Sequence, residues 1–150
     1  MVRTLNEFDD CIKKGLLRKT APSMDGAMKS MSRAKMWLSQ SKEALDAEIY
    51  DSSILASYEA MFHAARALLI KDGYREKSHY CISRYLGHAY SHKGRLNPDW
   101  IVMLDSYREA RHQVAYTIEV EATGAEAKEA IKDAEAFIKA MSGQLSKKSY

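Results

Sequence analysis

Apolar side chains recur along this chain at steps of three and four residues, the spacing that places them on one face of an α-helix. The pattern predicts helices over about 4–14, 24–47, 54–69, 78–91, 99–118 and 123–141. Short turns separate these segments, and short turns make consecutive helices antiparallel neighbours. The sequence therefore predicts an all-α fold: an up-and-down four- to five-helix bundle with a short N-terminal helix.

Capping residues and chain breakers mark the ends of the predicted helices. Capping side chains are expected at Ser23, 51–53, Ser78, Asn97 and Thr123, where Glu126 completes a capping box. Gly73 suits a helix C-terminus, because glycine adopts the left-handed backbone conformation without strain. The stretches 18–23 and 74–78 are predicted to be a linker and a charged connection.

A single domain is expected, since 150 residues with 46% hydrophobic side chains suffice for one core. We divide the chain into an N-terminal helix and linker at 1–22, a helical bundle at 23–145 and a frayed tail at 146–150. The most apolar segment, 54–69, also carries small alanines that let neighbouring helices approach, so it is predicted to be central. Methionines along 24–47 are predicted to lie in the core.

Two arginines interrupt the apolar face of the segment 101–118. That face consists of Ile101, Leu104, Arg108, Arg111, Ala115 and Ile118. A guanidinium cannot lose its charge, so a buried Arg111 would need a carboxylate, backbone carbonyls, a second subunit or a phosphate. His112 and Tyr116 lie one turn apart beside this face. We select Arg108 and Arg111 as phosphate-binding candidates and Arg111, His112 and Tyr116 as catalytic candidates. The alternative is a structural arginine, ion-paired between helices, beside a surface histidine.

Net charge and cysteine content narrow the class of protein. The net charge of +3 permits an acidic partner but falls short of a strongly basic nucleic-acid-binding protein. No apolar run approaches the roughly 20 residues that span a bilayer, and acidic residues occupy the place of a signal peptide's apolar region. A cytoplasmic protein without membrane contact is expected. Cys11 and Cys81 form no CxxC pair, so both are predicted to be reduced thiols.

Common cofactor motifs are missing from the sequence. It contains no GxGxxG, GxxxxGK or GxSxG motif, which disfavours dinucleotide binding, P-loop hydrolysis and α/β-hydrolase chemistry. Glu-x-x-His pairs at 76–79 and 109–112 have the spacing of di-iron ligands, and His88 and His92 have that of a zinc pair, but further ligands are lacking. No metal and no other cofactor are therefore expected.

The sequences SILASYEAMFHAARALLIKDGYREKSH at 53–79 and YREARHQVAY at 107–116 resemble the HEPN family, over roughly 31–138. This resemblance implies a four- or five-helix bundle that forms a homodimer. It also implies a toxin–antitoxin context, in which a minimal nucleotidyltransferase is the partner. Many family members are metal-independent endoribonucleases whose signature is arginine, four to six residues and then histidine.

The chain departs from that signature. Arg111 matches the family arginine, but Tyr116 stands where histidine would complete the shortest form, and no histidine follows. Tyrosine, with a pKa near 10, is a poor base at neutral pH but can donate a hydrogen bond. We therefore expect a dimer that binds RNA or a nucleotide at an arginine-lined cleft, with weak or absent cleavage. The alternative is a non-catalytic interaction protein, whose arginines hold the dimer or the partner nucleotidyltransferase.

Overall fold

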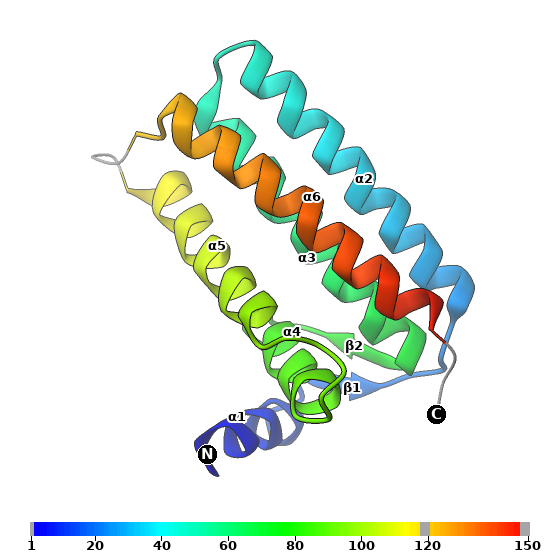
Figure 1. Cartoon of the computed structure of the whole chain (residues 1–150). Helices are drawn as coiled ribbons and strands as arrows, with labels where there is room; N and C mark the ends of the chain where they lie inside the picture. Colours follow the sequence, from blue (N-terminus) through cyan, green and yellow to red (C-terminus); the bar gives the residue numbers. More distant parts are fainter. Residues whose placement is uncertain (1, 118–120, 148–150) are drawn as a thin grey trace.

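Four long helices form the body of the protein, and the two N-terminal elements of the chain pack at one end of it (Figure 1). The computed structural model describes residues 2–117 and 121–147, with side chains from Glu7 onward. Its elements are α1 Val2–Lys13, β1 Leu17–Lys19, α2 Met24–Asp46, α3 Tyr50–Asp72, β2 Tyr74–Glu76, α4 His79–Leu86, the π-helix η1 Gly87–Ser91, α5 Asp99–Tyr116 and α6 Gly124–Ser146. The predicted helical bundle is confirmed.

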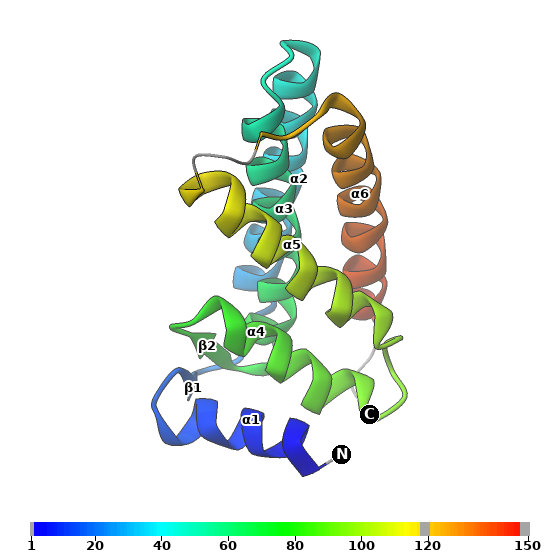
Figure 2. The ribbon, with the colours of Figure 1, turned by 90° about the vertical axis from the view of Figure 1, so that its left-hand side faces the viewer.

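Helix α3 is the central element, as its composition predicted. It contacts α2, α6, α5 and α4, and Figure 2 shows α5 crossing in front of it. Its small side chains Ala60, Ala64 and Ala67 are fully buried in the protein, and so are larger ones such as Met61 and Leu68. Small and large residues alternate around the helix, so neighbours can approach from several sides.

A cluster of three buried serines joins α2 to α3. Ser41 Oγ donates to the Ser53 carbonyl at 2.8 Å and lies 2.6 Å from Ser57 Oγ, while Ser53 Oγ donates to the Ser41 carbonyl at 2.9 Å. The prediction that residues 51–53 cap this helix is therefore wrong. Ile49 is the N-cap and offers no side-chain cap, and Asp51 instead accepts the backbone N–H of Ala122 at 2.9 Å.

The stretches predicted to be a linker and a charged connection contain a small sheet. Strands β1 and β2 pair antiparallel, with Leu17 opposite Glu76 and Lys19 opposite Tyr74. Leu17 is buried in the hydrophobic core, whereas the rest of β1 is exposed. Three residues are too few for an alternating pattern to be recognised, and pairing between segments nearly 60 residues apart leaves no local signal.

Two other predicted helix caps are confirmed. Ser23 accepts the backbone N–H of Gly26 at 2.9 Å, and Thr123 with Glu126 forms the capping box of α6. Ser78 is the N-cap of α4 but makes no capping bond with its side chain. Asn97 Oδ1 accepts the backbone N–H of Asp99, but the N-cap of α5 is Pro98, so the prediction of Asn97 as its N-cap is wrong. The predicted helix 78–91 is divided into α4 and the π-helical turn η1.

Gly73 ends α3 in the left-handed conformation, with φ of 89°. A Cβ atom there would lie 2.7 Å from the Thr20 carbonyl oxygen and 2.9 Å from Pro22 Cγ. We expect Gly73→Ala to lower the free energy of unfolding by at least about 1–2 kcal/mol, because it adds this contact to the backbone strain. Urea denaturation measures the change.

Gly143→Ala is the matched control for Gly73. Gly143 lies inside α6, where an added Cβ meets nothing within 4 Å. Alanine favours the helix, so this variant should be about 0.5–1 kcal/mol more stable than the wild type. Equal changes in both variants would contradict the role of Gly73.

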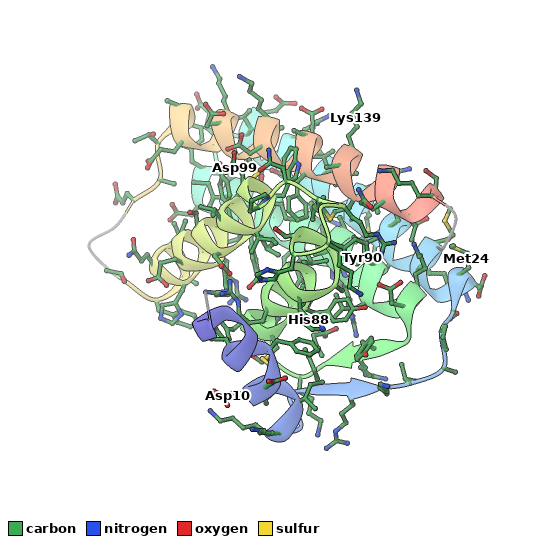
Figure 3. The ribbon with its side chains drawn as sticks, turned by 60° about the horizontal axis from the view of Figure 1, so that its bottom comes forward. Asp10, Met24, His88, Tyr90, Asp99 and Lys139 are labelled. Atoms are coloured by element: carbon green, nitrogen blue, oxygen red, sulfur yellow. A yellow bond between two sulfur atoms is a disulfide. The ribbon has the colours of Figure 1, made fainter. Side chains whose placement is uncertain are left out.

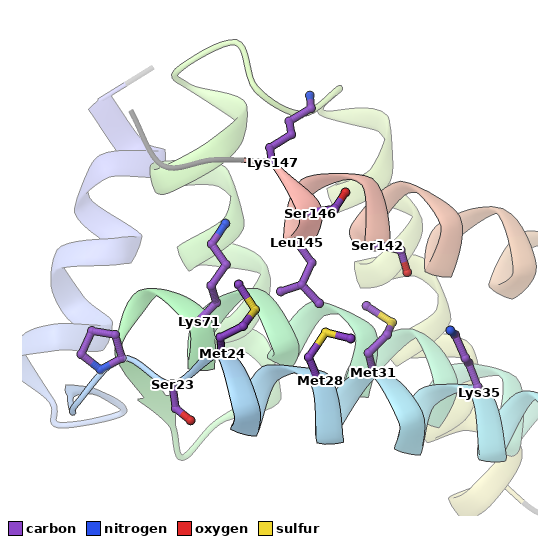
Figure 4. A pocket seen from close by; sticks show the side chains of 11 residues that line it. Ser23, Met24, Met28, Met31, Lys35, Lys71, Ser142, Leu145, Ser146 and Lys147 are labelled. Carbon is purple, nitrogen blue, oxygen red and sulfur yellow. The ribbon is translucent and has the colours of Figure 1, made fainter.

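The methionines of α2 lie only partly in the core, which corrects the prediction. Met31 is buried, but Met24 and Met28 are 50% and 54% exposed. Both line a groove of about 710 Å³ between the start of α2 and the end of α6, with Lys35, Lys71 and Lys147 around it (Figure 4). Helix α6 covers α3 and only one side of α2, so Met24 and Met28 remain exposed to solvent.

Cys11 of α1 and Cys81 of α4 form a disulfide, with Cα atoms 5.9 Å apart (Figure 3). The prediction of two reduced thiols is therefore wrong for this structure. Helix α1 packs on α4 and η1, and the Phe8 ring stacks on His88 of η1 with centroids 3.8 Å apart. This docking brings together cysteines 70 residues apart, which cysteine counting cannot reveal. None of the described helices has an apolar stretch long enough to cross a membrane.

Candidate functional site

The arginines of α5 face the first turn of α4 across an open pocket of about 510 Å³. We call it the arginine pocket. Its lining residues are His79, Arg108, Glu109, Arg111 and His112. Helix α5 brings both guanidinium groups to one place because they lie three residues apart, and α4 adds an imidazole from a distant part of the chain.

Arg108 belongs to a chain of ion pairs. Its Nη1 donates to Asp105 Oδ1 at 2.6 Å, and the other oxygen of Asp105 accepts from Arg84, which also pairs with Glu7 of α1 at 3.0 Å. The guanidinium also lies over the ring of Tyr80, 5.3 Å from its centroid. The single negative charge of Asp105 is shared by two guanidinium groups. Asp105 therefore orients Arg108 but does not fully neutralise its charge.

Arg111 is half-buried and lacks such a partner. Within residues 2–117 and 121–147, no carboxylate oxygen lies within the 4.0 Å of an ion pair from it. Glu59 of α3 is the acidic group that interacts with it at longer range. Burial raises the pKa of Glu59, and the positive charge of Arg111 opposes that rise. The guanidinium therefore lines the pocket with no direct ion pair to any carboxylate of the described residues.

His79 is the residue that sequence reasoning missed. Its Nδ1 lies 2.9 Å from the hydroxyl of Tyr58, and its ring stacks on Phe62 with centroids 4.0 Å apart. Burial lowers the pKa of His79, and the charges of Arg111 and Arg108 lower it further. The imidazole is consequently neutral at neutral pH. Its partners come from α3 and α5, so no spacing around residue 79 could have indicated the site.

The two other candidates on α5 lie farther out. His112 lines the arginine pocket but is exposed, and its ring centroid is 4.9 Å from that of Tyr116. Tyr116 is 67% exposed and does not line the pocket. The structure thus brings Arg108, Arg111 and His112 together but leaves Tyr116 outside. Ile118, the end of the predicted apolar face, lies outside the described residues.

The two Glu-x-x-His pairs differ in their surroundings. Glu76 pairs with Arg66 Nε at 3.1 Å and does not line the pocket that His79 lines, whereas Glu109 and His112 both line it. In the described part of the chain, no group of three or more His, Cys, Asp or Glu side chains is arranged to hold a metal ion. The arginine pocket presents two guanidinium groups and two imidazoles, with the carboxylate of Glu109 beside them.

Fold and sequence together place the protein in a family. The structure defines an all-α bundle with α3 at its centre and a cationic pocket between α4 and α5. A family model described as HEPN domain matches residues 27–144, most of the chain. The protein belongs to the HEPN family, whose domains are in general related to ribonuclease activity or nucleotide binding. A search of curated proteins found no match.

Proposed function

We propose that the arginine pocket binds the phosphate groups of RNA and that the protein is a metal-independent endoribonuclease of low activity. The observation that carries this proposal is Arg111: a half-buried guanidinium with no ion-pair partner among the described residues, beside Arg108 and His79. Phosphate oxygens form stronger hydrogen bonds with two guanidinium groups than the oxygens of a neutral ligand do, because charge-assisted bonds are short and strong.

His79 takes the place of the family's missing motif histidine in this proposal. The Tyr58 hydroxyl and His79 Nδ1 share one hydrogen bond of 2.9 Å, in which either group can donate. The proposal requires the tautomer in which Nδ1–H donates to the Tyr58 oxygen, because Nε2 is then unprotonated and can act as a base. Burial raises the pKa of Tyr58, so its hydroxyl remains protonated and neutral. A neutral imidazole held in one orientation is what a general base requires.

The reaction would follow the usual course of metal-free RNA cleavage. His79 removes the proton of the 2′-hydroxyl group, and that oxygen attacks the adjacent phosphorus. The bond from phosphorus to the 5′ oxygen breaks, and the leaving oxygen takes a proton from His112 or water. Arg111 and Arg108 stabilise the negative charge that grows on the phosphoryl oxygens. The products are a 2′,3′-cyclic phosphate and a 5′-hydroxyl end.

Family membership and the exposed outer face of α5 support a proposal for the assembly. Val102 and Tyr116 are 63% and 67% exposed there. We include in the proposal a homodimer through this face, which would set two arginine pockets near each other and bring Tyr116 to the partner's pocket. The proposed location is the cytoplasm, where RNA is abundant. The proposed partner is a minimal nucleotidyltransferase, with which the protein would form a toxin–antitoxin pair.

The test of phosphate binding is the affinity of a fluorescent single-stranded RNA in excess EDTA, with cleavage followed on the same samples. We expect Arg111→Ala to weaken binding about 10- to 100-fold, since hydrogen bonds to charged groups contribute about 1.5–3 kcal/mol. Inorganic phosphate should compete with the RNA. Arg18→Ala, which removes the same charge from an exposed position on β1, should change the affinity little.

The same variants distinguish the alternative function. If the protein were a non-catalytic interaction module, Arg111→Ala would dissociate the dimer or lower its stability, and wild-type protein would neither bind nor cut RNA. Sedimentation and thermal unfolding of each variant therefore accompany the binding assay. A dimer that persists while RNA affinity falls supports the proposed function, and the reverse pattern contradicts it.

A further inference from the structure

A second hollow, of about 800 Å³, adjoins the arginine pocket between α2, α3 and the end of α5. We call it the tryptophan cleft. Its walls include the apolar side chains Ala44, Ile49, Leu55 and Ala56, and Trp37 and Glu59 bring polar atoms to it. Arg111 lines both hollows, so the cleft continues directly from the proposed phosphate site.

Two buried polar atoms at this cleft lack hydrogen-bond partners among the described residues. They are Nε1 of Trp37, a donor, and Oε2 of Glu59, an acceptor. Such groups normally find partners, and leaving them unpaired in the interior destabilises the protein. The two unpartnered atoms therefore point to a ligand that offers an acceptor to Trp37 and a donor to Glu59.

The register of α2 and α3 places the residues Trp37 and Glu59 at about the same level of the bundle. Ser30 Oγ donates to the carbonyl of His63, and Ser41 bonds to Ser57, which fixes the antiparallel alignment on either side. Trp37 lies between the two serines along α2, just as Glu59 lies between their partners along α3. The carboxylate can also rotate about its last torsion, which is soft, and so turn Oε2 towards the cleft.

We propose that the tryptophan cleft binds a nucleobase bearing an exocyclic amino group, while the attached phosphate occupies the arginine pocket. This inference rests on the proposed function and names the part of the nucleotide that the arginine pocket leaves uncovered. The apolar walls receive the faces of the planar ring. The Trp37 N–H donates to a ring nitrogen or carbonyl, and the Glu59 carboxylate accepts from the amino group.

The same chemistry disfavours uracil. Its ring N–H lies between two carbonyl oxygens. When that N–H donates to Glu59 and one carbonyl accepts from Trp37, the second carbonyl lies against the carboxylate and is repelled. Adenine, cytosine and guanine each present an amino donor beside an acceptor, which matches the two unpartnered atoms. Arg111, shared by both hollows, would contact the phosphate of the bound nucleotide and balance the charge of Glu59.

The first test follows Trp37 fluorescence in the Trp100→Phe variant. The chain has two tryptophans, and Trp100 packs against Phe137 and does not line the cleft, so this variant leaves Trp37 as the only tryptophan, which is excited selectively at wavelengths that tyrosine does not absorb. We expect AMP, CMP or GMP to change its emission and to bind at least tenfold more tightly than UMP or inorganic phosphate. Emission that responds equally to UMP and AMP would overturn the inference.

The second test exchanges the acceptor. Glu59→Gln keeps the size of the side chain but adds an amide donor that can bond to a uracil carbonyl. The preference for AMP over UMP should fall about tenfold, while the affinity for inorganic phosphate should not fall. Trp37→Phe keeps an aromatic face and removes the donor. It should lower the affinity for AMP without lowering the affinity for inorganic phosphate.

The failures of the two proposals are distinguishable. If inorganic phosphate binds and Arg111→Ala abolishes that binding, but AMP and UMP bind alike, the phosphate site stands and the base site is refuted. If inorganic phosphate and RNA do not bind at all, the proposed function itself is refuted. Retained discrimination between bases in Glu59→Gln would refute the role given to Glu59.

Discussion

Replacing His79 by glutamine is expected to slow RNA cleavage by about 10²–10⁴-fold, the usual contribution of a general base. Glutamine can keep the hydrogen bond to Tyr58 and the packing on Phe62, so RNA affinity should change little. The measurement is single-turnover cleavage of a labelled RNA in EDTA, with the affinity determined in parallel. A large loss of rate at unchanged affinity separates a role in the reaction from a role in binding.

The pH dependence gives this prediction a sign. Burial and the two arginines lower the pKa of His79 below its ordinary value of 6.5. A base must be unprotonated, so the rate should rise with pH through this lowered pKa and be level at neutrality. Bound phosphate offsets the arginine charges and should move the rise to higher pH at saturating RNA. The rise should disappear in His79→Gln.

His63→Gln is the matched control for the base. His63 also packs against Phe62, with ring centroids 5.1 Å apart, and burial lowers its pKa to about 4. It lines neither the arginine pocket nor the tryptophan cleft. Cleavage should persist in this variant. An equal loss in both variants would show that His79 acts through the packing of Phe62, and full cleavage by His79→Gln would assign the base to another group.

Reduction of the Cys11–Cys81 disulfide is expected to lower the free energy of unfolding by about 2–4 kcal/mol. The bond joins cysteines 70 residues apart. A disulfide lowers the conformational entropy of the unfolded chain, and this effect grows with the length of the closed loop. Urea unfolding with and without a dithiol reductant measures the difference. The double variant Cys11→Ser, Cys81→Ser should match the reduced wild type and should not respond to the reductant.

The disulfide also connects to the arginine pocket. It holds α1 on α4, and Glu7 of α1 pairs with Arg84, which in turn shares Asp105 with Arg108. Release of α1 would leave Arg84 with Asp105 as its remaining carboxylate, and Arg108 would then be less firmly held. We expect RNA affinity to change in the reduced protein by less than in Arg111→Ala. If the urea unfolding curve is the same with and without the reductant, the stabilising role of the disulfide is refuted.

Local sequence was sufficient for the helices and most of their ends. Gly73, Ser23 and the capping box at Thr123 act through residues within a few positions of themselves, and their predicted roles are confirmed. The composition of α3 likewise indicated the central helix, because burial on several sides requires small and apolar residues all round. The family resemblance at 53–79 and 107–116 depends on the same local patterns.

The sequence by itself determined that this protein is a helical bundle of the HEPN family and that Arg108 and Arg111 share one face. Only the tertiary structure decided which groups meet those arginines. His79, Glu59 and the Cys11–Cys81 bond each join helices that are far apart in the chain. Helical periodicity reports the face on which a residue lies, whereas the partner of that face depends on how whole helices pack.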